Sequence, residues 1–276
     1  MTPESGLPAL LEPYEVASEK AEEFTAKGHT VLRGLATADE VGAFRPAIEE
    51  TTARLNRETR PIEARDTYGR AFLQTVNLWR ADETVKRFVF AQRFARAAAE
   101  LLGVDGVRLY HDQSLFKEGG GGRTPWHQDQ FYWPLDTDRT ITLWMPLVDL
   151  DESVGSMTFA SGSHRAGDLG GGDISDRSDA ELGLLLEERG LTPETHGALR
   201  AGDATFHAGW TLHSAAPNPT GAMRPVMTVI YFADGTRVCE PSGPFQRFDL
   251  EMWLDGCAPG GPADGHLNPL LWTRRR

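Results

Sequence analysis

Apolar residues recur at helical spacing in the first part of the chain. Between Asp82 and Gly103, apolar side chains return every three or four positions, as on the buried face of an amphipathic helix. Asp82 stands at an N-cap position and Gly103 where such a helix would end. Thr37, followed three residues later by Glu40, forms a capping-box pattern that predicts another helix start. We therefore expect residues 1–105 to be mainly helical.

From residue 106 onward the pattern changes to short runs in which apolar and polar residues often alternate. Segments such as "RTITLWMPLVDL", "DATFHAGWTLHS" and "PVMTVIYFAD" are rich in β-branched and aromatic residues and are separated by turn residues. Short strands at such spacing predict a sandwich or barrel. We expect one domain over residues 1–276, with a jelly-roll core over 106–235 and a wrapping segment rich in proline and glycine over 236–276.

One stretch within the strand-rich half, "DISDRSDAELGLLLEERG", predicts an inserted helix with Ser178 or Asp179 as its cap. The glycine-rich loops at 118–122 and 167–173 do not precede a helix with the Lys-Ser/Thr pair of a phosphate-binding loop. Nucleotide binding is therefore not expected.

Composition and charge narrow the range of partners. The chain has 276 residues, of which 40% are hydrophobic and 25% charged, as in a soluble globular protein. A formal net charge of -12 repels nucleic-acid backbones and anionic membranes, so we expect neither as a partner. Two cysteines form no disulfide framework, and the N-terminal "MTPESGLPALLEPYE" lacks the pattern of a signal peptide. These features predict a cytoplasmic monomer or homodimer that acts on a small molecule.

The stretch "TPWHQDQFYW" places a histidine and an aspartate two positions apart among aromatic residues. On a β-strand such residues point to the same face, so His127 and Asp129 would offer a nitrogen and an oxygen to one point. The later stretch "FHAGWTLHSAAPNPTGAMRP" contains His207, His213 and Arg224. One histidine from a facing strand would complete a two-histidine, one-carboxylate set, which suits Fe(II) and oxygen chemistry. Arginine adds a planar, permanently charged partner for the carboxylate of a cosubstrate.

At these residues the chain resembles the phytanoyl-CoA dioxygenase family of Fe(II)- and 2-oxoglutarate-dependent oxygenases. The resemblance runs from about Val31 to Ala233 and is most specific in "PWHQDQFYW", "LWMPLVDLDESVGSMTFASGSHR" and "AGDATFHAGWTLHSAAPNPTGAMRP". It implies a double-stranded β-helix, the jelly-roll barrel of cupin-like proteins, flanked by N-terminal helices. It also implies Fe(II) as the metal and 2-oxoglutarate and O2 as cosubstrates, with succinate and CO2 as products.

The resemblance also implies roles for individual residues. In the family, iron is held by the His-x-Asp pair, here His127 and Asp129, and by a later histidine that precedes the 2-oxoglutarate-binding arginine. Arg224 follows His213 at the family's spacing, whereas its distance from His207 is too long. His213 is therefore the expected third ligand. His207 is expected to contact one of the metal ligands rather than the metal itself.

The pocket for 2-oxoglutarate is expected, on the same resemblance, to be lined by Gln113 and Trp144, and Gln74 is expected to face the cavity. Halogenases of the family lack the carboxylate, so the presence of Asp129 argues against chlorination. We see no basic cluster that would receive the phosphates of a coenzyme A thioester. The expected reaction is hydroxylation of an unactivated C–H bond in a small organic molecule, with secondary-metabolite tailoring as the favoured setting.

Several alternatives stay open at this point. The same radical chemistry also leads to epimerisation, cyclisation or desaturation. A cupin-like metalloenzyme that uses no keto acid would not need Arg224, and a binding module would not need three intact ligands. We expect the residues that select the substrate in loops around 60–80, 117–125 and 166–180.

The residues around the His-x-Asp pair also carry expectations. Gln128 and Gln130 would point to the other face of the strand and have structural roles. The aromatic residues of the same stretch are expected to form the pocket wall, namely Trp126, Phe131, Tyr132 and Trp133.

Overall fold

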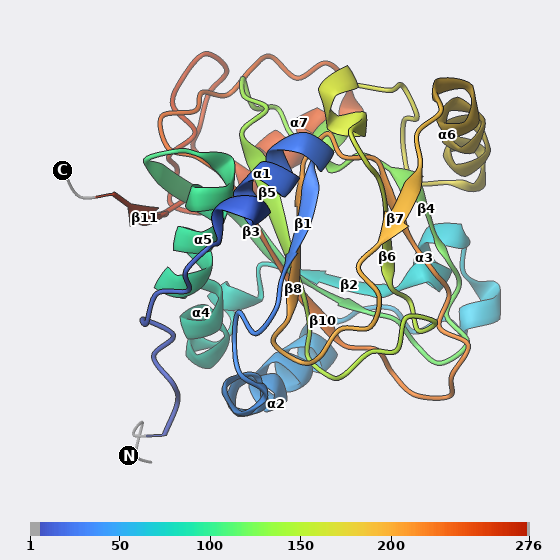
Figure 1. Ribbon diagram of the computed structural model, residues 1–276, viewed down its shortest axis with the longest axis horizontal. Helices are drawn as coiled ribbons and strands as arrows, with labels where there is room; N and C mark the ends of the chain where they lie inside the picture. The colour runs from blue at the N-terminus through green and yellow to red at the C-terminus, as the bar shows by residue number, and fades with distance from the viewer. Residues whose placement is uncertain (1–5, 275–276) are drawn as a thin grey trace.

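The computed structural model describes residues 6–274 (Figure 1). Residues 1–5 and 275–276 lie outside the described part, and the first five belong to the stretch that was searched for a signal peptide. The strands are β1 (His29–Leu32), β2 (Leu73–Val76), β3 (Gly106–Phe116), β4 (Thr124–His127), β5 (Thr140–Pro146), β6 (Met157–Ala160), β7 (Pro193–Thr195), β8 (Ala204–Ala208), β9 (His213–Ala215), β10 (Val226–Ala233) and β11 (Leu270–Thr273). They form two antiparallel sheets. The larger has the order β1-β8-β5-β10-β3-β11, with β2 also paired to β3, and the smaller has the order β4-β9-β6-β7.

Helices cover one side of the larger sheet and the edge of the smaller one. They are α1 (Ser18–Lys27), α2 (Ala38–Leu55), α3 (Thr67–Ala71), α4 (Glu83–Val89), α5 (Gln92–Leu102), α6 (Asp176–Arg189) and α7 (Pro244–Trp253). Helix α5 packs against β3, β5 and β10, whereas α6 packs against β4 (Figure 1). This arrangement confirms the predicted jelly-roll core with N-terminal helices. None of the helices in residues 6–274 combines the length and the apolar character needed to cross a bilayer.

Strands β5 and β8 are buried along their whole length, because one face meets the helices and the other meets the barrel interior. The largest apolar cluster lies between the helices and the larger sheet and includes Phe44, Phe94 and Phe206. A second cluster, with Trp144 and Phe159, lies between the two sheets. The barrel interior is therefore packed in part and leaves room for a cavity beside this second cluster.

The helix predicted between Asp82 and Gly103 is two helices in the structure. The predicted ends are confirmed, because the Asp82 side chain accepts hydrogen bonds from two N–H groups of the first turn and Gly103 has a φ of 66°. The helical conformation is interrupted at residues 90–91. Phe88 and Phe94 pack edge to face across the break, with ring centroids 5.2 Å apart. The turn thus lets both short helices bury their apolar faces in the same core.

The predicted cap of α6 is wrong by three or four residues. Ser175 is the N-cap, and its hydroxyl accepts a hydrogen bond from the Ser178 backbone N–H while the Ser178 hydroxyl accepts one from the Ser175 N–H. Ser178 thus completes a capping box from inside the helix.

Candidate active site

The barrel contains a cavity of about 440 Å³ between the two sheets and α7. All six residues expected to act in catalysis or cosubstrate binding line this cavity. They are His127, Asp129, His213, Gln113, Trp144 and Arg224. Gln74, which was expected to face the cavity, also lines it.

Two neighbouring strands of the smaller sheet bring the two histidines together. His127 is the last residue of β4, His213 is the first of β9, and the two lie directly opposite each other in the antiparallel pair. The expectation that Asp129 lies on the same strand as His127 is wrong, because β4 ends at His127 and Asp129 begins a 3-10 turn (Asp129–Tyr132). Gln128 between them has an extended backbone, with φ -124° and ψ 124°. The alternation of side chains therefore continues for one more residue and still brings Asp129 to the side of His127.

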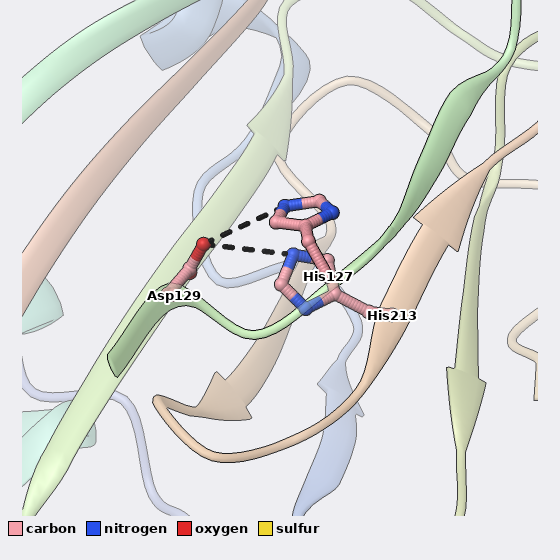
Figure 2. Close-up of side chains that lie close together, drawn as sticks. All are labelled: His127, Asp129 and His213. Carbon is pink, nitrogen blue, oxygen red and sulfur yellow. Dashed lines mark ion pairs between the residues drawn. The ribbon is translucent and has the colours of Figure 1, made fainter. Parts of the chain in front are cut away.

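The three side chains converge on one point (Figure 2). The Nε2 atoms of His127 and His213 each lie 3.7 Å from Oδ1 of Asp129, and the three potential ligand atoms all lie within 4.8 Å of one another. The Nδ1 atoms lie 2.8 Å and 2.9 Å from the carbonyl oxygens of Pro125 and Thr211. A carbonyl only accepts, so each Nδ1 carries the proton and each Nε2 keeps a free lone pair. The tautomers therefore suit metal coordination.

The second oxygen of Asp129 is held by two other residues. Its Oδ2 accepts hydrogen bonds from the Thr142 hydroxyl at 3.0 Å and from Nε2 of His207 at 3.1 Å. Thr142 on β5 and His207 on β8 are cross-strand partners. His207 thus contacts the carboxylate from outside, as expected of a supporting residue, and fixes its rotation so that Oδ1 faces the two histidines.

The charges of the three residues also suit a divalent cation. Burial lowers the pKa of His127 and holds the pKa of His213 well below its ordinary value, so both imidazoles are neutral at neutral pH. Burial alone would raise the pKa of Asp129, but His213, His207 and His127 around it outweigh this effect and hold its pKa far below the ordinary value. The site therefore offers two neutral nitrogens and one carboxylate oxygen, which fits the donor set preferred by Fe(II) in oxygenases.

Arg224 lies just before β10 and is 2% exposed. Its Nη1 donates to the Gly155 carbonyl at 2.7 Å and its Nη2 to the Leu115 carbonyl at 3.3 Å, while the guanidinium lies 5.2 Å from the Trp144 ring centroid. Within residues 6–274, its Nε has no hydrogen-bond partner. Burial lowers its pKa to about 9, so the group stays charged at neutral pH.

A second buried cation, Lys117, stands beside Arg224 and was not predicted from the sequence. The two residues form a backbone bridge, and a Cβ on Gly155 would stand 3.2 Å from the Cδ atoms of both. The Lys117 ammonium donates to the Gly122 carbonyl and lies 3.4 Å from the hydroxyl of Thr124, which lines the cavity. In the described part of the chain, no carboxylate forms an ion pair with either cation.

The remaining lining comes in about equal parts from the barrel strands and from segments outside them. The Tyr68 hydroxyl donates to Gln74 at 2.6 Å, and Gln74 donates to Gln113 at 2.5 Å, which forms a polar row along the wall. Of the loops expected to select the substrate, residues 60–80 and 166–180 do line the cavity, whereas 117–125 contributes only Thr124. The C-terminal segment was expected to be a wrapping coil with short helices, but not to line the cavity, and four residues of α7 do so: Phe245, Phe248, Asp249 and Trp253.

The expected aromatic wall is half correct. Tyr132 and Trp133 line the cavity, but Trp126 packs in an apolar cluster with Leu182 of α6, and Phe131 packs against Phe245. In the 3-10 turn, successive side chains no longer alternate between two faces as they do on a strand. The sequence pattern therefore could not predict which aromatic residues of this turn face the cavity.

The two glutamines of this stretch have structural contacts. Gln128 donates to the carbonyls of Gly167 and Trp210, and Gln130 donates to the Thr137 carbonyl. These bonds anchor the turn that carries Asp129.

A two-histidine, one-carboxylate face inside a jelly-roll barrel matches the class of non-haem iron oxygenases. Residues 24–226 match the family model of phytanoyl-CoA dioxygenase (PhyH), so the chain belongs to the phytanoyl-CoA dioxygenase family. A probable alpha-ketoglutarate-dependent hypophosphite dioxygenase of Stutzerimonas stutzeri is 25% identical over 232 residues, which is 78% of each chain. The ectoine dioxygenase of Nocardia farcinica is 23% identical over 246 residues, which cover 82% of this chain and 81% of that protein.

Solved structures give the same fold. The epimerase SnoN, in complex with Fe3+, alpha ketoglutarate and nogalamycin RO, is 26% identical, with a TM-score of 0.76 over 92% of this chain and 98% of that one. The carbocyclase SnoK from nogalamycin biosynthesis is 22% identical, with a TM-score of 0.76 over 96% and 99%. The predicted family, jelly-roll fold, enzyme class and cofactors are thus confirmed: the protein is an iron- and 2-oxoglutarate-dependent oxygenase.

Proposed function

We propose that His127, Asp129 and His213 hold the Fe(II) ion. The observation that carries this proposal is the convergence of two Nε2 lone pairs and one carboxylate oxygen on a single point of the cavity wall. The Nδ1 hydrogen bonds to backbone carbonyls keep both rings in the required tautomer. Three protein ligands on one face leave coordination positions for a chelating cosubstrate and for O2.

We further propose that Arg224 binds the distal carboxylate of 2-oxoglutarate, beside Gln113 and Trp144. A buried guanidinium and a buried ammonium without a carboxylate partner are unfavourable unless an anion is bound next to them. The two donors of Arg224 that bond backbone carbonyls hold the group in place, and its unpaired Nε leaves capacity for the anion. The Lys117 ammonium adds a second positive charge to the same end of the cavity.

The reaction that these groups support best is hydroxylation of a C–H bond in a small organic molecule. When bound together, Fe(II) and 2-oxoglutarate activate O2 and supply the oxidant, with succinate and CO2 as co-products. The chain itself orients the ligands, holds the keto acid and surrounds the reacting carbon with side chains that exclude water. Hypophosphite, ectoine and nogalamycin, named for the relatives, are unlike one another, so the relatives do not specify the substrate.

The cosubstrate site is tested by anaerobic titration of the Fe(II) protein with 2-oxoglutarate, followed through the weak charge-transfer band that the chelated keto acid gives in the visible. We expect the wild-type protein to develop the band. Arg224→Met should weaken 2-oxoglutarate binding by roughly a hundredfold, the scale for removing one partner of a buried charge pair, and leave Fe(II) binding intact. Arg177→Met removes an exposed arginine and serves as the matched control. A wild-type protein without the band, or an Arg224→Met protein with unchanged affinity, would contradict the proposal.

The outcome of the reaction is tested by mass spectrometry of a converted substrate. Hydroxylation adds one oxygen atom, desaturation or cyclisation removes two hydrogens, and epimerisation leaves the mass unchanged. We expect the gain of one oxygen, and either of the other results would replace hydroxylation by the corresponding reaction.

A further inference from the structure

The cavity contains a buried carboxylate that the iron site and the keto-acid site do not use. Asp249 of α7 is 6% exposed and lines the cavity. Its Oδ2 accepts a hydrogen bond from the Tyr110 hydroxyl at 2.7 Å. No lysine or arginine of residues 6–274 forms an ion pair with it, and burial raises its pKa to about 7 although the Tyr110 and Trp253 side chains act in the opposite direction. The charged form of Asp249 therefore needs a partner that this part of the chain does not supply.

A second buried carboxylate shows what a structural role looks like in the same fold. Asp112 is 0% exposed, and burial also raises its pKa to about 7. Its two oxygens, however, accept hydrogen bonds from the backbone N–H groups of Leu78 at 2.9 Å and Trp79 at 3.3 Å, and it does not line the cavity. Asp112 thus holds a turn in place, whereas Asp249 presents its carboxylate to the substrate space.

The walls around Asp249 are aromatic. Besides Trp144 at the keto-acid end, seven aromatic side chains line the cavity: Tyr68, Phe72, Tyr132, Trp133, Phe245, Phe248 and Trp253. Phe245 and Phe248 of α7 are 40% and 53% exposed, although large apolar side chains are usually covered. A bound molecule with a ring system would cover them and would pack against the other rings, and aromatic faces also attract cations.

The charges of the lining disfavour an anionic substrate. Arg224 is the only lysine or arginine among the lining residues in the described part of the chain. In the proposed function, the positive charges of iron and Arg224 are balanced by Asp129 and the dianionic keto acid, and Lys117 adds one further positive charge. Three acids that line the cavity remain, namely Asp249 and the exposed Asp66 and Asp173, and together they outweigh Lys117. The substrate side of the cavity is therefore negative and attracts a cation.

A polar atom near Asp249 points independently to a ligand. His111 lines the cavity and is 7% exposed, and within residues 6–274 its Nδ1 has no hydrogen-bond partner. Its ring lies 5.5 Å from that of Trp253 on α7. A buried nitrogen without a partner beside an open cavity is satisfied when a ligand binds there, for example by a hydroxyl group of the substrate.

We propose that the substrate is a ring-containing molecule with a basic amine, and that Asp249 pairs with its ammonium group. This inference rests on the proposed function, because the charge balance assumes bound iron and 2-oxoglutarate. Helix α7 lies beyond residues 24–226, the part that matches the family model. The substrate preference is thus encoded in a segment separate from the one that carries the iron ligands and Arg224.

The proposal is tested with three probes of similar shape and different charge: 2-naphthylmethylamine, 2-naphthalenemethanol and 2-naphthoate. Their affinities for the anaerobic Fe(II)–2-oxoglutarate protein are measured by calorimetry. We expect the amine to bind roughly tenfold more tightly than the alcohol, the scale of a hydrogen bond to a charged group, and the carboxylate to bind most weakly. Cyclohexylmethylamine should bind more weakly than the naphthyl amine, because it lacks the aromatic face.

Variants of the chain assign the preference to one residue. Asp249→Asn should bring the amine and the alcohol to equal affinity and leave the affinity for 2-oxoglutarate unchanged. Tyr110→Phe removes the hydrogen bond but keeps the carboxylate, so it should keep the preference for the amine. Asp255→Asn changes an exposed acid of the same segment and is the matched control.

The outcomes separate this inference from the proposed function. If the wild-type protein shows the visible band but binds the alcohol or the carboxylate as well as the amine, the substrate class is wrong while the iron site stands. A preference for the amine that survives in Asp249→Asn would remove the role of Asp249. If the band is absent, the proposed function itself fails. The probe series on the wild-type protein remains decisive if Asp249→Asn does not fold.

Discussion

The two ends of the cavity hold buried charges of opposite sign. Within residues 6–274, none of these charges forms an ion pair. At one end, Arg224 and Lys117 have no carboxylate in contact, and at the other, Asp249 has no cation. Buried charges normally have partners within the protein, so an unpaired charge beside a cavity indicates the charge of the missing ligand. The comparison assigns an anion to the first end and a cation to the second.

The two ends also differ in how they are built. The proposed iron and keto-acid end consists mainly of paired strands, since His127 and His213 lie on β4 and β9 and Arg224 lies two residues before β10. The substrate end consists of short helices and connecting segments, including α3 and α7. Strand pairing fixes side chains through the backbone, whereas a helix on the surface can change without breaking the barrel. The fold thus separates the chemistry from the choice of substrate.

The largest effect is expected at the metal end. Asp129→Ala removes one of three ligands and should reduce turnover below detection, while the circular dichroism spectrum of the fold stays unchanged. Asp151→Asn, which alters a fully exposed carboxylate, is the control. Turnover near the wild-type rate in Asp129→Ala would show that iron is held elsewhere.

A smaller effect is expected when the hydrogen bond from His207 to the proposed metal ligand Asp129 is removed. His207→Phe removes the hydrogen bond to Oδ2 of Asp129 and should weaken Fe(II) binding about 10- to 100-fold, as is typical when the partner of a metal ligand is lost. Direct titration with Fe(II) under anaerobic conditions measures this. His207→Gln keeps a donor and should restore part of the affinity. A merely structural role would instead lower the melting temperature without changing Fe(II) affinity in the folded protein.

The Cδ atoms of Arg224 and Lys117 both lie near Gly155, so a substitution there tests whether the placement of these side chains matters for 2-oxoglutarate binding. Gly155→Ala places a Cβ 3.2 Å from the Cδ atoms of Arg224 and Lys117, at a backbone φ of +61°. It should raise the KM for 2-oxoglutarate roughly three- to tenfold, since about 1 kcal/mol of binding is lost when the guanidinium shifts. Gly162→Ala has a φ of +81° with open space around it, so it carries the same backbone strain and should leave this KM unchanged. Equal effects of both variants would argue against the role of Arg224.

The smallest effect concerns pH. Burial, together with Arg224, lowers the pKa of Lys117 to about 7. Above this pH the unfolded chain binds more protons than the folded one, so this group makes the ligand-free protein more stable as pH rises towards the unfolded pKa of about 10.4. The protonated form of Lys117 favours binding of an anion without being required for it, because Arg224 also binds the anion. The affinity for 2-oxoglutarate should therefore fall only about threefold between about pH 6 and about pH 8.5. Lys117→Met should abolish this dependence, and a persisting dependence would exclude Lys117.

The sequence was sufficient where it resembles a known family. The spacing of His127 and Asp129 is common by itself, and it was the resemblance to the phytanoyl-CoA dioxygenase family that singled out His213 and Arg224 for the iron and keto-acid end. Strand alternation was also enough to predict the barrel, although it placed Asp129 on the wrong element.

The substrate end could not be predicted in this way, because burial there depends on contacts between distant segments. Lys117 looks like an ordinary lysine until the Gly122 loop and Gly155 enclose it. Asp249 becomes a buried acid only when α7 packs beside Tyr110 of β3. The spacing of Phe245, Phe248 and Asp249 does fit one face of a helix, but the surrounding prolines and glycines suggested only a wrapping coil with short helices.

The pairing of His127 with His213 has a consequence for how the enzyme matures. Strands β5, β6, β7 and β8 and helix α6 lie between them in the chain, and β9 has only three residues. Pairing of such distant segments comes with a large loss of chain entropy, so we expect this strand pair to close late in folding. An ion bound to both imidazoles joins β4 to β9 and stabilises the folded state over the unfolded one. Iron bound in this way would cross-link two strands of the smaller sheet, and it could bind only after the chain has been synthesised beyond His213.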